Sequence, residues 1–202
     1  MKTIRFGPVE IASDDSVLEP RPWTLAQAEW VAELPLGPML ELGCGAGHIG
    51  LAAAVLTGSA LVQVDRSQSA CGWAATNAER AGVAERVSQR CGDVHDVLRP
   101  EERFAVVIAD PPYVESGGVR RFPHDPESAI DGGPDGLELT RFFLAVAADH
   151  LAPGGGIVLQ LGAPAQIDAV AAWLDGPDAP GLAVVDRRVV ADDRSLALLR
   201  RV

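Results

Sequence analysis

The segment MLELGCGAGHIG, residues 39–50, restricts the fold of this chain more than any other part of its sequence. A short apolar run leads through glycines at alternate positions, Gly43, Gly45 and Gly47, directly into a helical pattern of small apolar residues. Glycines at such a junction permit a tight turn and let a ligand approach the backbone. Because open α/β sheets bind ligands beyond the carboxyl ends of their strands, the segment predicts a strand–turn–helix unit with a binding site at the turn.

Strand-like and helical runs alternate along the rest of the chain, which predicts a parallel sheet covered by helices on both faces. The last two strand-like runs are separated only by residues 191–194, so they must be antiparallel, since a parallel crossover needs about a dozen residues. The expected strands lie at residues 39–43, 60–65, 86–93, 104–110, 153–162, 182–190 and 195–202, and the expected helices at 25–34, 46–58, 67–82, 136–151 and 163–174.

These elements predict a Rossmann-like α/β fold with a seven-stranded, mostly parallel sheet, helices on both faces and a C-terminal antiparallel hairpin. We expect residues 1–22 to form an irregular N-terminal arm and residues 23–202 to form one catalytic domain, with Thr24 capping its first helix. The Gly- and Pro-rich stretch at residues 115–135 is too long to be an idle connection, so we expect it to act as a substrate loop or lid.

Charge, residue spacing and hydropathy argue against several kinds of binding site and against a membrane location. The formal net charge of −11 argues against extended nucleic-acid binding without help from another molecule. The cysteines Cys44, Cys71 and Cys91 form no CxxC pair and are odd in number, so we expect reduced thiols rather than a disulfide or a zinc site. The four histidines show no metal-ligand spacing, so no metal is expected. No apolar run could span a membrane and no signal-peptide core precedes the domain, which favours a cytoplasmic location.

The glycine turn alone leaves the ligand open. Gly45, Gly47 and Gly50 also match the GxGxxG pattern of dinucleotide sites, and Asp65 follows Gly45 by 20 residues, as that pattern requires. The position of Glu41, where its carboxylate can face a cationic ligand, favours S-adenosylmethionine. Asp65 could then accept hydrogen bonds from ribose hydroxyls and Asp93 from the adenine amine. The expected cofactor site comprises Glu41, Gly43, Cys44, Gly45, Gly47, Asp65, Arg66, Asp93, Val94 and Asp110.

A second motif ends the apolar run at residues 104–109. Asp110 is followed by Pro111, Pro112 and Tyr113, and prolines cannot continue a central strand, so the chain leaves the sheet through a rigid corner. A side-chain oxygen and a backbone carbonyl held there can both accept hydrogen bonds from one planar –NH2 group, on which the tyrosine ring can stack. This arrangement favours methyl transfer to an amide or aromatic amine nitrogen, with these four residues as the catalytic set.

The tetrapeptide resembles the (Asp/Asn/Ser)-Pro-Pro-aromatic motif of class I S-adenosylmethionine-dependent methyltransferases. The segment LEPRPWT and the region from DPPYV to GGGIVLQLG further resemble the protein-glutamine methyltransferases that act on release factors. The resemblance implies a protein glutamine as the methyl acceptor. The family usually has Asn where this chain has Asp110, and Glu where it has Leu25. The implied substrate contacts are Arg21, Trp23, Thr24, His124 and Asp125.

The layout of this chain is also similar to that of the single-domain eukaryotic and archaeal relatives, which implies a small activating partner protein.

Three alternatives to methylation of a protein glutamine stay open at this point. The acceptor could be an exocyclic amine of an RNA or DNA base, or a small molecule. The glycine pattern could belong to a nicotinamide-dependent oxidoreductase, although the only Tyr and the only Lys, Tyr113 and Lys2, form no evident hydride-transfer pair. The chain could also bind the ligand without turnover.

Overall fold

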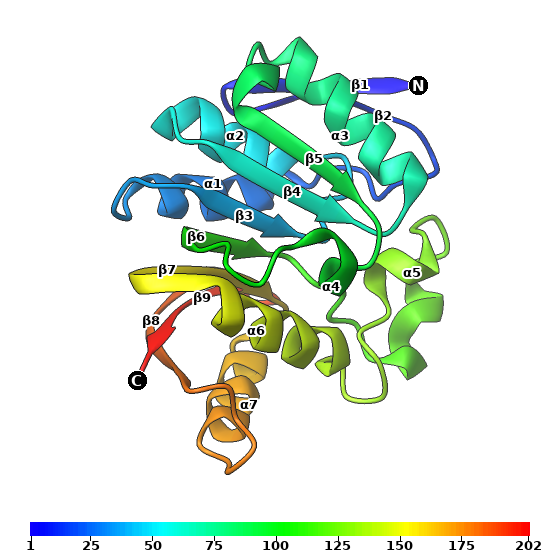
Figure 1. The fold of residues 1–202 in the computed structure, drawn as a ribbon. Helices are drawn as coiled ribbons and strands as arrows, with labels where there is room; N and C mark the ends of the chain where they lie inside the picture. The colour runs from blue at the N-terminus through cyan, green and yellow to red at the C-terminus, as the bar shows by residue number, and fades with distance from the viewer.

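The computed structural model describes residues 1–202 and contains a seven-stranded sheet with the strand order β5-β4-β3-β6-β7-β9-β8 (Figure 1). The strands from β5 to β7 are parallel, whereas β9 is antiparallel to both of its neighbours. The predicted fold class is therefore confirmed. The strands are β3 (Met39–Leu42), β4 (Leu61–Asp65), β5 (Val87–Cys91), β6 (Phe104–Ala109), β7 (Leu151–Leu161), β8 (Leu182–Ala191) and β9 (Arg194–Arg201).

Helices cover both faces of the sheet because its central strands are apolar on both sides. In β6, Val106 and Ile108 join one buried cluster, whereas Val107 and Ala109 join the other, as successive strand residues point to opposite faces. Helices α1, α2 and α3 pack into the first cluster and α4, α6 and α7 into the second (Figure 1). The helices are α1 (Leu25–Ala32), α2 (His48–Thr57), α3 (Gln68–Arg80), α4 (Val94–Val97), α5 (Glu127–Ile130), α6 (Glu138–His150) and α7 (Pro164–Leu174).

The expectation of an irregular N-terminal arm is wrong for its first half. Strands β1 (Lys2–Phe6) and β2 (Val9–Ser13) form an antiparallel hairpin that turns at Gly7, whose φ is +52°. Phe6, Val9 and Ile11 alternate toward the first cluster, and the side chain of Asn77 on α3 pairs with both the N–H and the carbonyl of Ala12. Burial of this alternating apolar face stabilises the hairpin, although the hairpin lies outside the main sheet.

Thr24 does not cap the first helix as predicted. It lies in a short 3-10 turn, Pro22–Thr24, and its Oγ1 donates a hydrogen bond of 2.8 Å to the carbonyl of Arg21. The hydroxyl therefore stabilises the turn that precedes α1 rather than a free N–H of the helix.

None of the helices combines the length and the apolar character that crossing a membrane requires.

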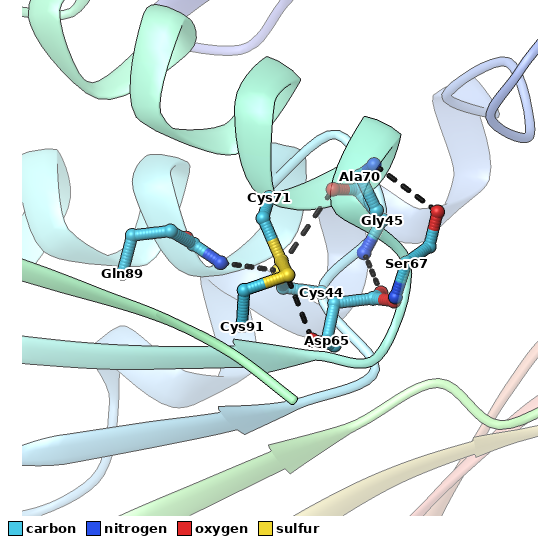
Figure 2. Close-up of a disulfide and its surroundings, with 8 residues drawn as sticks. All are labelled: Cys44, Gly45, Asp65, Ser67, Ala70, Cys71, Gln89 and Cys91. Carbon is cyan, nitrogen blue, oxygen red and sulfur yellow. Dashed lines mark hydrogen bonds between the residues drawn. A yellow bond between two sulfur atoms is a disulfide. The ribbon is translucent and has the colours of Figure 1, made fainter. Parts of the chain in front are cut away.

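The prediction of three reduced thiols is wrong for two of them, because Cys71 and Cys91 form a disulfide (Figure 2). Their Cα atoms lie 5.8 Å apart, since the first turn of α3 packs over the carboxyl end of β5. Cys71 and Cys91 are 20 positions apart and form no CxxC motif, so their proximity arises only from the tertiary fold. Cys44 stays free and buried beside this pair.

Candidate active site

The carboxyl ends of β3, β4, β5 and β6 meet at one edge of the sheet, around a cavity of about 490 Å³. The cavity brings together most of the residues that the sequence predicted for the cofactor. Gly47 lies outside its lining, as do Pro111 and Tyr113. The predicted residues that line the cavity are Glu41, Gly43, Cys44, Gly45, Asp65, Arg66, Asp93, Val94, Asp110 and Pro112.

The glycine turn is shaped by positive φ angles and by its contact with Asp65. Gly45 has a φ of +53°, and a Cβ at this position would face open space, so the backbone here is accessible from the cavity. Its N–H donates a hydrogen bond of 2.9 Å to Oδ2 of Asp65, while Oδ1 accepts one of 2.8 Å from the N–H of Ser67. Figure 2 shows Asp65 between the turn and the start of α3. A single carboxylate thus holds two walls of the cavity together.

Gly47 has a structural role beneath the turn. Its φ is +80°, and a Cβ there would come within 2.8 Å of Nε2 of Gln63. That amide also donates a hydrogen bond of 3.2 Å to the Gly47 carbonyl. The glycine therefore permits the close approach of β4 to the turn, and its predicted contact with the cofactor stays a prediction.

Glu41 is buried and supports the turn from within the fold. Its Oε1 accepts a hydrogen bond of 3.0 Å from the N–H of Gly50, and its Oε2 accepts one of 2.6 Å from Nε2 of Gln63. Burial raises the pKa of the Glu41 carboxyl to about 7, and the negative charges of Asp110 and Asp65 add to that shift. A cation in the cavity would favour the ionised form of this carboxyl.

Asp110 follows directly on the end of β6, which is fixed from the side by a buried glutamine. The Nε2 of Gln27 on α1 donates hydrogen bonds to the carbonyls of Ala109, at 2.9 Å, and Val158, at 2.8 Å. Burial raises the pKa of the Asp110 carboxyl to about 7, and the positive charge of Arg194 and a hydrogen bond from Gln160 oppose the shift. A second carboxyl that titrates near neutrality therefore lines the same cavity as Glu41.

The tetrapeptide backbone is covered by glycines from the loop that follows it. A Cβ on Gly132 would lie 2.7 Å from the Pro112 carbonyl, and a Cβ on Gly136 would lie 2.6 Å from the Tyr113 carbonyl. The latter carbonyl also accepts a hydrogen bond of 2.9 Å from Nε2 of Gln166 on α7. The carbonyls of Pro111 and Pro112 accept no backbone hydrogen bond, and Gly132 lies against that of Pro112.

The predicted substrate residues separate into two groups. Arg21 and Asp125, far apart in the sequence, form an ion pair of 2.6 Å that joins the N-terminal segment to the loop at residues 115–135. Together with His124 they line a second groove, of about 640 Å³, beside the main cavity. Trp23 lines neither cavity; its ring centroid lies 4.8 Å from Cζ of Arg194 and 6.0 Å from Cζ of Arg21. Thr24 is buried, and its hydroxyl donates a hydrogen bond to the Arg21 carbonyl.

Comparison with known proteins supports a methyltransferase domain in this part of the chain. The family profile described as "Methyltransferase domain" matches residues 39–117, which include the glycine turn, Asp65, Asp93 and the tetrapeptide. The chain carries a methyltransferase domain. Its architecture, with a C-terminal antiparallel hairpin beside a parallel sheet, agrees with that assignment.

The resemblance to glutamine methyltransferases that the sequence predicted is confirmed. The "Release factor glutamine methyltransferase" of Gloeobacter violaceus is 33% identical over 79% of this chain and 59% of its own length. That of Moorella thermoacetica is 37% identical over 78% of this chain and 58% of its own length. The "Ribosomal protein uL3 glutamine methyltransferase" of Bradyrhizobium diazoefficiens is 34% identical over 71% of this chain and 48% of its own length. The chain thus spans about half to three fifths of the length of these relatives.

Solved structures share the fold of this methyltransferase domain at low sequence identity. The ribosomal protein L11 methylase of Lactobacillus delbrueckii subsp. bulgaricus aligns with a TM-score of 0.66 and 16% identity, over 93% of this chain and 83% of that one. TrmN of Thermus thermophilus aligns with a TM-score of 0.64 and 22% identity, over 89% of this chain and 48% of that one.

Several residues of the methyltransferase cavity were not predicted from the sequence. Phe142 and Phe143 of α6 line it, although from the sequence they were expected only as part of a helix at residues 136–151. His48 also lines it; burial lowers its pKa to about 4, and its Nδ1 has no partner. The only sequence signal that could have pointed to His48 is its position directly after the glycine turn. Further unpredicted lining residues include six from the N-terminal segment and the loop: Ser16, Val17, Leu18, Pro126, Ser128 and Ala129.

Proposed function

We propose that the protein is an S-adenosylmethionine-dependent N-methyltransferase whose acceptor is the side-chain amide of a protein glutamine. One observation carries the proposal: Asp110 lines the same cavity as the glycine turn at Gly43 and Gly45. A donor bound at the turn and an –NH2 group held by the tetrapeptide would therefore meet across one cavity. Proximity of this kind supplies a large part of the barrier reduction in group transfer.

The cavity suits a cationic methyl donor. The carboxyl groups of Glu41, Asp65, Asp93 and Asp110 line it, with Arg66 as the one arginine in the lining. Burial raises the pKa of Glu41 and Asp110, and a sulfonium or ammonium group bound in the cavity would favour their ionised forms. Apolar side chains on another part of the wall, including Val64, Val94, Phe142 and Phe143, would contact the adenine ring.

The remaining roles follow from the positions of polar groups around the cavity. Asp65 would accept hydrogen bonds from ribose hydroxyls, because each of its oxygens can accept more than the one bond it has. Asp93 caps α4 through Oδ1, which accepts from the N–H of His95 at 3.0 Å, so Oδ2 is free for the adenine amine. Ser16 to Leu18 and the loop at residues 126–129 would cover the bound donor.

The tetrapeptide would orient the acceptor nitrogen. The carboxylate of Asp110 and the carbonyl of Pro111 each accept one N–H, which directs the nitrogen lone pair toward the cavity. S-adenosylmethionine supplies an electrophilic methyl group, and its transfer to the amide nitrogen leaves S-adenosylhomocysteine and releases one proton. Tyr113, whose pKa is raised to about 12 by burial and the Asp110 charge, stays neutral and can stack on the planar amide.

A protein acceptor is favoured over a nucleic acid by the names of the relatives and by the formal net charge of −11. A release factor and ribosomal protein uL3 are the first acceptors to test. Both names belong to translation, so we place the enzyme in the cytoplasm. We further propose that residues 23–202 form the catalytic domain, and that a small activating partner protein could dock beside residues 1–22.

The test begins with calorimetric titration of S-adenosylmethionine, S-adenosylhomocysteine and a nicotinamide dinucleotide. Binding of the two adenosyl compounds alone is expected, and binding of the dinucleotide instead would contradict the proposal. Radiolabelled methyl transfer is then measured with purified release factor, uL3, tRNA and ribosomal RNA in parallel. We expect label in a protein glutamine and none with Asp110→Ala, which should still bind the donor. Label only in RNA would favour base methylation, and none in any acceptor would favour a binding-only domain.

A further inference from the structure

A cation from the C-terminal hairpin lies against the acceptor side of the site, at a position that no sequence motif marked. Arg194 is the first residue of β9, and its side chain is only 18% exposed. Its Cζ lies 4.8 Å from the ring centroid of Trp23 and 5.6 Å from that of Tyr113. Segments far apart in the sequence therefore place this guanidinium directly beside the tetrapeptide.

The guanidinium is held there by aromatic rings rather than by a buried acid. Its only ion pair, with the neighbouring Asp193 at 2.8 Å, involves a carboxylate that is 74% exposed. Exposed pairs of this kind contribute little to stability, so the pair does not explain why the arginine is buried. Contact with two ring faces does explain it, because a planar cation is attracted to aromatic faces.

Two N–H donors at this place lack an acceptor within the protein. The Nε of Arg194 and the Nε1 of Trp23 are both buried and have no hydrogen-bond partner. A buried donor without a partner costs free energy, and a native fold seldom tolerates two of them side by side without a reason. An acceptor atom supplied by a bound substrate would satisfy them.

The chemistry of Asp110 identifies which acceptor atom that would be. An ionised carboxylate only accepts hydrogen bonds, so Asp110 can hold the –NH2 half of a carboxamide but can donate nothing to its carbonyl oxygen. That oxygen needs a donor of its own when the substrate is taken out of water. The positive charge of Arg194 opposes the rise in the pKa of Asp110, and its Cζ lies 5.6 Å from the ring centroid of Tyr113 in the same tetrapeptide.

We propose that Arg194 is a specificity-determining residue, which donates a hydrogen bond to the carbonyl oxygen of the substrate carboxamide while Asp110 accepts one from its –NH2 group. The inference rests on the proposed function and narrows it, because such a pair selects a planar amide over an amine with no acceptor beside it. A site built to pair both halves of a polar group rejects analogues that lack one half.

The experiment compares Arg194→Met and Arg194→Lys with Arg187→Met, an exposed arginine of β8 that pairs with Asp168 outside the site. The probe is purified bacterial release factor with radiolabelled S-adenosylmethionine, and donor binding is measured by calorimetry. For Arg194→Met we expect kcat/KM to fall about 100-fold, as for loss of one preorganised donor, with donor affinity unchanged at a pH high enough to ionise Asp110. The acid limb of its pH profile should move to higher pH, because Asp110 loses a neighbouring positive charge.

Arg194→Lys keeps the charge but loses the planar fork of donors. Its acid limb should stay in place while kcat/KM falls about tenfold. Arg187→Met should match the wild-type enzyme in every readout. If Arg194→Met binds no donor because it fails to fold, Arg194→Lys decides, and a wild-type rate for that variant would overturn the proposal.

The outcomes separate this inference from the function on which it rests. A wild-type enzyme that labels release factor, with Arg194→Met as active as Arg187→Met, would contradict the role of Arg194 alone. A wild-type enzyme that binds the donor but labels only RNA, or nothing, would contradict the glutamine assignment and the carboxamide role of Arg194 together.

Discussion

The backbone N–H of Gly45 donates a 2.9 Å hydrogen bond to Oδ2 of Asp65, joining the glycine turn after β3 to the end of β4. The other carboxylate oxygen holds the N–H of Ser67 at the entry to α3. One side chain therefore fixes the position of the turn while it lines the cavity. Its removal should loosen the turn and remove the proposed ribose acceptor at the same time.

Asp65→Ala is accordingly expected to weaken S-adenosylmethionine binding about 10- to 100-fold, the loss associated with hydrogen bonds to a charged group. Calorimetric titration measures the change. The matched control is Asp96→Ala, which removes an exposed acid from α4 outside the cavity and should leave affinity unchanged. Equal affinities for the two variants would show that Asp65 does not contact the donor.

Donor binding should depend on pH through the two buried carboxyls. The pKa values of Glu41 and Asp110 are raised to about 7, so both hold protons at pH 5.5 and release them above pH 7. A cation favours the ionised forms, and its binding therefore releases protons at low pH. S-adenosylmethionine affinity should rise at least about tenfold between pH 5.5 and 7.5. Calorimetry in buffers of different ionisation enthalpy measures the proton release, which Glu41→Gln should reduce.

The same raised pKa predicts how folding stability depends on pH. In the unfolded chain Glu41 ionises near its usual pKa of 4.5, whereas in the folded protein it keeps its proton up to about pH 7. The contribution of Glu41 is fully present below pH 4.5 and is lost as the pH rises to 7, by about 3 kcal/mol in total. The lowered pKa of His48 acts in the opposite direction between about pH 4 and 6.5.

Chemical denaturation of the wild-type protein and of Glu41→Gln separates these two contributions. His48 is present in both proteins, so the difference between their free energies of unfolding should decline from pH 4.5 to 7 and then level off. A difference that stays constant with pH would mean that Glu41 is ionised throughout that range.

Gly50 is required by the buried carboxylate rather than by its own backbone angles. A Cβ at this position would lie 2.3 Å from Oε2 of Glu41 and 3.0 Å from Cδ2 of Leu61. Gly50→Ala should therefore displace Glu41 and lower the free energy of unfolding by about 1–3 kcal/mol, the usual cost of overpacking. Gly72→Ala on the exposed face of α3 meets no atom within 4 Å and should instead stabilise by about 0.5–1 kcal/mol. Denaturant unfolding of the two variants gives the comparison.

The parts of the structure that follow local pattern were predicted, and those that depend on distant contacts were not. The apolar runs and the glycine turn specify seven strands and the edge where Glu41, Asp65 and Asp110 meet, because a parallel sheet brings its carboxyl ends together. The N-terminal hairpin was missed although residues 4–11 alternate, because it pairs outside the main sheet. Arg194 carries no motif, and its place beside Tyr113 depends on how β9 returns along β7.

The disulfide between Cys71 and Cys91 shows the same limit and gives the last prediction. It links α3 to the end of β5 next to the cavity, since Cys91 lies two residues before Asp93 and the Cys71 sulfur lies 3.3 Å from the Asp65 carbonyl oxygen. Cross-linking residues 20 apart restricts the unfolded chain, so reduction should lower the free energy of unfolding by about 3 kcal/mol. Cys71→Ser should lose the same amount and be insensitive to reductant.

Thiol labelling of the denatured protein checks the pairing directly. One cysteine, Cys44, should react without reductant and all three after reduction. Cys44→Ala is the control, because it leaves the disulfide intact and should retain the reductant-dependent loss of stability. Because the bond fixes α3 against the end of β5, reduction should also weaken S-adenosylmethionine binding. Three reactive thiols without reductant, together with unchanged stability, would show that the two cysteines are only neighbours.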